Sequence, residues 1–116
     1  MIHDLSAFRQ LILEATSLEP VFEPDLTQIR GHIRFVDSSI LHVRENYIKP
    51  INEIDYAYHW QTADHQLIRR WDNAHPVDLP TSPHHQHVGS QGNVQPSGPM
   101  TLETVLRFIE SSLISD

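Results

Sequence analysis

The stretch EIDYAYHWQTADHQLIRRWDN, residues 53–73, carries the clearest fold signal in the chain. Apolar and polar side chains alternate in both of its halves, and a period of two predicts two β-strands. Asp64 and His65 can join the strands as a two-residue hairpin loop, provided that both accept a positive φ. If Ala63 then faces Gln66, the numbers of paired residues add up to 129, which predicts the whole register.

This register gives the hairpin two different faces. The aromatic face is predicted to be core beneath helices, because large rings are usually buried, and it consists of Tyr56, Tyr58, Trp60 and Trp71. If Trp60 or Tyr58 were exposed instead, its ring could stack on a nucleic-acid base. The polar face carries Gln61 and places His59 opposite Arg70, with Asp72 near enough to interact.

Two more strands are predicted before the hairpin, so that the sheet covers residues from about 27 to 73. Apolar residues alternate with polar ones over 29–35 and again over 41–47. The polar side chains of these two strands are expected to form a solvated face, and they are His32, Arg34, His42 and Arg44.

A helix is predicted on each side of this sheet in the sequence. The first covers about residues 4–17, with helical spacing from Phe8 to Ala15, capping by Asp4 or Ser6, and prolines after it. The second covers about residues 101–115, where apolar residues recur at helical spacing after Thr101, a suitable N-cap. Residues 74–100, rich in proline and glycine, are predicted to be a long loop that is either functional or mobile.

The expected fold is therefore α+β: a four-stranded antiparallel β-meander with an N-terminal and a C-terminal helix packed on one face. A chain of 116 residues suits one domain, residues 1–116, with a single core.

Composition limits the cellular setting and the partners. The chain has no cysteine and no apolar run near the roughly 20 residues that a membrane span needs, so a cytoplasmic location without a membrane partner is expected. A net charge of −7 argues against a protein that coats nucleic acid regardless of sequence. The basic residues gather between 30 and 70, so any phosphate site is expected there.

Two stretches of the sequence resemble a known protein family. The resemblance lies in YAYHWQTADHQLIRRWDNAHPVDLPTSPHHQHVG, residues 56–89, followed by PSGPMTLETVLRFI, residues 96–109. Its most specific parts are the aromatic strand with His59, RWDNA at 70–74 and PHHQH at 83–87, and together they are similar to the TumE family of bacterial type II toxin-antitoxin pairs. The family hairpin tends to be Asp-Gly, where this chain has Asp64-His65, and Pro76 replaces a second histidine after His75. The resemblance implies a growth-inhibiting toxin neutralised by a cognate protein antitoxin, without implying a reaction.

The residues suggest metal-independent RNA cleavage, and the resemblance adds the analogy that many toxins of this type attack RNA. RNA cleavage or translation inhibition is therefore expected. Cleavage needs a base for the 2′-hydroxyl, a cation for the phosphorus centre and an acid for the leaving oxygen. We expect His59 as base, Arg70 as phosphate clamp and Asp72 as the carboxylate that orients an imidazole. The acid would be a loop histidine, if the loop folds over that face, and the candidates are His84, His85 and His87.

Other interpretations stay open. The cluster of His59, Arg70 and Asp72 can be a purely structural polar network. The chain can also be a non-enzymatic toxin or binding protein that acts by protein contact. A third possibility is a divalent metal such as zinc, for which His85 and His87 point the same way in extended chain, with Asp72 or His75 as third ligand.

Overall fold

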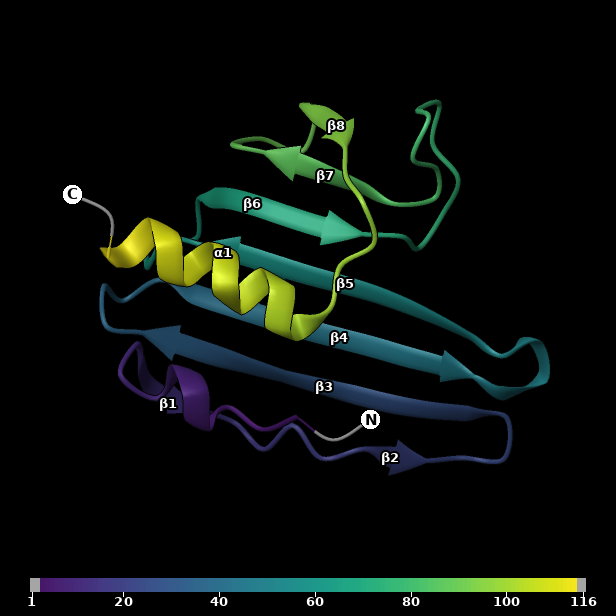
Figure 1. The fold of residues 1–116 in the computed structure, drawn as a ribbon, viewed down its shortest axis with the longest axis horizontal. Helices are drawn as coiled ribbons and strands as arrows, with labels where there is room; N and C mark the ends of the chain where they lie inside the picture. Colours follow the sequence, from purple (N-terminus) through teal and green to yellow (C-terminus); the bar gives the residue numbers. More distant parts are fainter. Residues whose placement is uncertain (1–2, 115–116) are drawn as a thin grey trace.

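The computed structural model describes residues 3–114, which form a large antiparallel sheet with an α-helix on one side (Figure 1). The sheet has eight strands in the order β1-β3-β4-β5-β6-β7-β8, and β2 also pairs with β3. The elements are η1 Ser6–Phe8, β1 Ile12–Ala15, β2 Val21–Phe22, β3 Leu26–Phe35, β4 Ile40–Ile48, η2 Lys49–Ile51, β5 Glu53–Gln61, β6 Leu67–Asp72, β7 His85–Val88, β8 Val94–Pro96 and α1 Leu102–Ile114. The predicted four-stranded meander with two helices is therefore wrong.

The central hairpin of β5 and β6 has the predicted register over most of its length. The observed pairs are Ala57 with Asp72, Tyr58 with Trp71, His59 with Arg70 and Trp60 with Arg69. The register then shifts, and Gln61 rather than Thr62 pairs with Leu67. The cause is a wider turn, in which the Thr62 hydroxyl accepts a hydrogen bond from the Gln66 amide while His65 takes a φ of 70°.

The N-terminal segment does not form the predicted helix over 4–17. It makes one 3₁₀ turn, at which the Ser6 amide donates to the Asp4 carboxylate, and then continues as strand β1. The pairing of Ile12 with Phe35 occupies backbone groups of β3 that would otherwise form an open sheet edge. Tertiary pairing thus prevails over a helical spacing of apolar residues.

The C-terminal helix α1 is present where the spacing predicts it, although the predicted last residue, 115, lies outside the described residues. Thr101 is the expected N-cap, because its Oγ1 accepts a hydrogen bond of 3.2 Å from the Thr104 amide. The helix buries one face, composed of Leu102, Val105, Leu106 and Ile109.

The segment 74–100, predicted to be a long loop, supplies two further strands. β7 pairs with β6 so that His85 lies opposite Asp72, and β8 pairs with β7 along the outside of the sheet. The proline at the end of β8 suits an edge, where no neighbouring strand needs its missing amide hydrogen.

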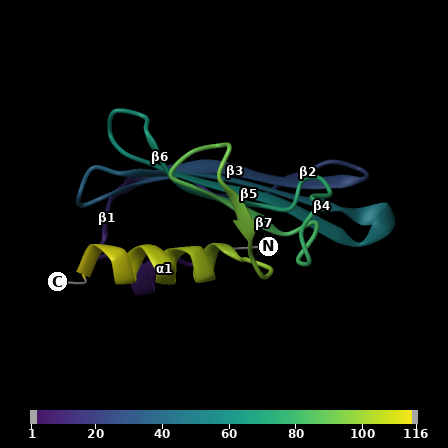
Figure 2. The same cartoon turned by 90° about the horizontal axis from the view of Figure 1, so that it is seen from above.

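The sheet has one covered face and one open face. Figure 2 shows α1 and the N-terminal turn on the same side of the sheet, with no helix drawn on the other side. The predicted aromatic core is confirmed on the covered face, where Tyr56, Tyr58, Trp60 and Trp71 are at most 4% exposed. The opposite face is called the open face below, and strand alternation gives it the polar side chains of β3 to β7.

Candidate functional site

A row of basic side chains crosses the open face. The strand registers place His32 opposite His42 and His42 opposite His59, with ring centroids 6.0 and 6.2 Å apart. The same row continues through Arg70, which lies opposite His59, to His87 on β7. Five adjacent strands therefore each contribute one imidazole or guanidinium to this row.

The middle of this row borders a hollow of about 300 Å³ on the open face. Its lining consists of Arg30, Gly31, His42, Val43, Arg44, Ala57, His59 and Arg70. Arg30 and Arg44 lie directly opposite each other, an arrangement that is destabilising for like charges. The Nε of Arg44 is buried and has no hydrogen-bond partner among the described residues. These features form a local cationic site in a chain of net charge −7.

The histidines at the hollow are held in their neutral form. Burial lowers the pKa of His59, and the positive charge of Arg70 and the neighbouring His42 lower it further. Burial also lowers the pKa of His42, with contributions from His32 and His65. The Nη1 of Arg70 donates to Nδ1 of His59 over 3.3 Å, so this nitrogen carries no proton. A neutral imidazole is the form that can accept a proton.

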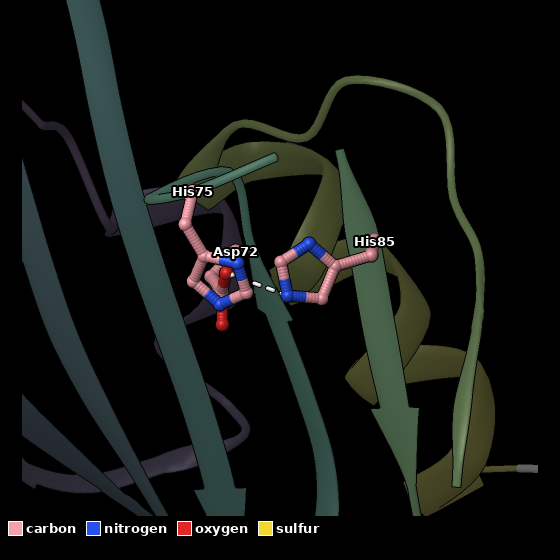
Figure 3. Close-up of side chains that lie close together, drawn as sticks. All are labelled: Asp72, His75 and His85. Atoms are coloured by element: carbon pink, nitrogen blue, oxygen red, sulfur yellow. Dashed lines mark ion pairs between the residues drawn. The ribbon is translucent and has the colours of Figure 1, made fainter. Parts of the chain in front are cut away.

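Arg70 connects the hollow to a second, buried cluster around Asp72. The Nε of Arg70 donates to Oδ2 of Asp72 over 2.9 Å. The Nε2 of His85 lies 2.9 Å from Oδ1 of the same carboxylate, and the Nε2 of His87 lies 3.7 Å from Oδ2. Asp72 is 3% exposed and His85 is fully buried. Figure 3 shows the close approach of Asp72 and His85 together with His75, which comes from the segment after β6.

Three histidines near Asp72 share one arrangement: the Nδ1 of each is hydrogen-bonded to a backbone carbonyl. The bonds run from His75 to Pro76 at 3.0 Å, from His85 to Pro83 at 2.9 Å and from His87 to Gln91 at 2.7 Å. A carbonyl oxygen only accepts, so each Nδ1 carries the proton, and in the neutral ring Nε2 is left with a lone pair.

His84 lies away from the other predicted site residues. Its Nδ1 is 2.7 Å from the hydroxyl of Tyr56, and the two rings stack with centroids 5.8 Å apart. Tyr56 belongs to the core under α1, so His84 points to the covered face while His85 and His87 approach Asp72. His84 points to one face of the sheet while His85 and His87 point to the other, which agrees with the alternation expected of extended chain.

The structure therefore brings together five of the six residues expected to be catalytic. It also adds residues that the sequence pattern assigned to a solvated face, above all Arg44 and His42 at the hollow. The sequence does contain a signal for the pairing of His32 with His42. Each lies five positions from Asp37, which is in the turn between their strands, so a symmetric hairpin pairs them.

Comparison with known proteins agrees with the resemblance seen in the sequence. A family model described as Toxin TumE matches residues 2–113. No curated protein and no solved structure matches the chain. Within the described residues no helix has both the length and the apolar character to cross a membrane. Because the family match covers nearly the whole chain, this protein belongs to the TumE family of toxins.

Proposed function

We propose that this toxin arrests growth by acting on RNA and that the hollow on the open face binds the ribose-phosphate backbone. Family membership supports the toxin role itself. The observation that carries the proposal is the gathering of three guanidinium groups and two neutral imidazoles around one hollow, in a chain of opposite net charge.

A bound phosphate explains the arginines of the hollow. Guanidinium groups bind phosphate oxygens through paired N–H donors and keep their charge at every physiological pH. The like charges of Arg30 and Arg44 face each other, and an anion between them converts repulsion into attraction. The buried Nε of Arg44 is a donor that such an anion would satisfy.

The two imidazoles supply acid-base chemistry on this phosphate. Arg70 would turn its Nη1 from His59 to a phosphate oxygen, which frees Nδ1 of His59 to accept the proton of the 2′-hydroxyl. The 2′-oxygen then attacks phosphorus, and the bond from phosphorus to the 5′-oxygen breaks. The negative phosphate raises the pKa of His42 in the complex, so this imidazole takes up a proton from solvent when RNA binds. His42 then gives that proton to the leaving 5′-oxygen. The products are a 2′,3′-cyclic phosphate and a 5′-hydroxyl.

The other residues expected from the sequence play different parts in this proposal. Asp72 is a positioning residue that holds Arg70 through its Nε. His85 is fully buried and His84 faces the core, so neither reaches the hollow. The base, the cation and the acid of this reaction need no metal ion. His87 stays at the end of the row, opposite Arg70.

The partner and the location of the toxin follow from the same proposal. A toxin of this family implies a protein antitoxin that neutralises it. If the substrate is cellular RNA, the toxin acts in the cytoplasm.

The test measures growth arrest in cells and cleavage of an RNA oligonucleotide by the purified toxin. The variants are His42→Gln, His59→Gln and Arg70→Ala, and the matched control is Arg9→Ala, which removes an exposed arginine before the sheet. Each histidine change is expected to slow cleavage by about 10²- to 10⁴-fold, the usual contribution of general acid-base catalysis. The control is expected to keep full activity.

Folding is checked by circular dichroism and by binding to the antitoxin. The proposal fails if all three folded variants still arrest growth and cleave RNA like the parent. It also fails if the parent arrests growth while RNA stays intact and unbound, a result that supports inhibition by protein contact instead.

A further inference from the structure

Asp72, His75 and His85 form a cluster that the proposed RNA chemistry does not require as a whole. One ligand atom of each lies within 4.8 Å of the others (Figure 3). We propose that these three residues bind a divalent transition-metal ion of the zinc type. This site goes beyond the proposed function, because the ion would hold the segment 73–84 against the sheet rather than take part in RNA cleavage.

The strongest observation is that Nε2 of His85 is buried without a hydrogen bond among the described residues. Its Nδ1 donates to the Pro83 carbonyl, so the neutral ring has a lone pair on Nε2. This Nε2 is buried and without a hydrogen bond among the described residues, although it lies only 2.9 Å from Oδ1 of Asp72. Two acceptors at this distance repel each other unless a cation binds both. Because the contact lacks hydrogen-bond geometry, a metal ion fits it better than a shared proton.

His75 supplies the third ligand with the same orientation. Its Nδ1 donates to the Pro76 carbonyl, which leaves Nε2 free to bind a metal, and its ring centroid is 4.9 Å from that of His85. Histidines that bind metals usually donate their other ring nitrogen to a carbonyl or carboxylate in this way. The Arg70 bond to Oδ2 of Asp72 likewise orients the ligating carboxylate. Oδ1 accepts a long hydrogen bond of 3.4 Å from the Ala74 amide and keeps a second lone pair for the ion.

The ligand set indicates the class of metal. Two imidazole nitrogens and one carboxylate oxygen suit Zn²⁺, Co²⁺ or Ni²⁺, whereas Mg²⁺ and Ca²⁺ prefer oxygen ligands throughout. Three protein ligands leave a fourth tetrahedral position for water. His75 is exposed, so the ion has a route from solvent to two otherwise buried ligands.

The experiment uses untagged full-length protein, so that an affinity tag does not bind the metal. After chelation and removal of the chelator, the protein is titrated with Zn²⁺, and metal content and Tm are measured. About one equivalent per chain is expected, with a rise in Tm of about 5 °C or more at saturating metal. Co²⁺ in the same site is expected to give the strong visible absorption of a tetrahedral nitrogen and oxygen environment.

Two variants make the test specific. His75→Ala removes an exposed ligand without opening the core and is expected to abolish stoichiometric uptake and the rise in Tm. The control His65→Asn removes another exposed histidine, at a positive φ that asparagine tolerates, and is expected to bind like the parent. The proposal is overturned if the folded parent binds neither Zn²⁺ nor Co²⁺ stoichiometrically, or if His75→Ala binds as much as the parent. These readouts do not depend on RNA cleavage, so the two proposals can fail separately.

Discussion

Replacing Tyr58 by phenylalanine is expected to destabilise the protein by about 1.5 to 3 kcal/mol, the usual contribution of a hydrogen bond to a charged group. The Tyr58 hydroxyl donates to the carboxylate of Glu45 beneath α1, where Tyr58 is 2% and Glu45 is 4% exposed. Burial and the nearby Glu45 both raise the pKa of Tyr58, which keeps the hydroxyl protonated as a donor. Phenylalanine would leave this buried carboxylate oxygen without its donor.

The structure limits the loss to the hydrogen bonds of the Tyr58 hydroxyl. The phenyl ring keeps its packing, so no cavity forms, and Nε2 of His3 stays 2.5 Å from the other oxygen of Glu45. The hydroxyl also accepts a hydrogen bond from the Leu102 backbone, and the substitution removes this bond too. For a chain of this size, each kcal/mol shifts Tm by about 4 °C, so a decrease of about 6 to 12 °C is expected.

Urea unfolding followed by tryptophan fluorescence measures the effect, since Trp60 and Trp71 are both buried in the same core. The double variant Tyr58→Phe with Glu45→Met removes donor and acceptor together and is expected to recover at least about 1 kcal/mol relative to the sum of the single changes. If the effects add within about 0.5 kcal/mol, the two side chains are not coupled and the argument is refuted.

Two more predictions concern the strands that form the hollow. Gly31→Ala is expected to lower the free energy of unfolding in urea by about 1 to 3 kcal/mol, because the new Cβ would lie 2.4 Å from Oγ1 of Thr16. This Oγ1 is held in place by a hydrogen bond from the His32 amide. Wild-type stability in this variant would contradict the packing of β3. The lowered pKa values of His42 and His59 mean that the unfolded chain binds protons more readily, so stability is expected to fall as pH drops below about 6.5. His59→Gln should flatten this decline in a series of unfolding curves, and an unchanged slope would exclude His59 as its source.

Part of the candidate site was predictable from the hairpin alone. Alternation over residues 53–73 predicts that His59 lies opposite Arg70 on a polar face with Asp72, and the structure has these pairs. The approach of His85 and His87 to Asp72 could not be predicted from neighbouring residues, because it depends on β7 pairing with β6 across a segment of irregular chain. The hollow depends on registers between β3, β4 and β5 that the pattern of any single strand leaves open.

The spacing of apolar residues was sufficient to predict an element where that element buries the face that its own periodicity makes apolar. The aromatic face of β5 and β6 is core, and α1 buries its apolar stripe, because neighbouring positions in those elements already separate apolar from polar side chains. The N-terminal segment and residues 74–100 behaved differently. Their backbones pair with the otherwise open edges of β3 and β6, and the free energy of satisfying a sheet edge depends on a partner distant in sequence rather than on the period of the segment itself.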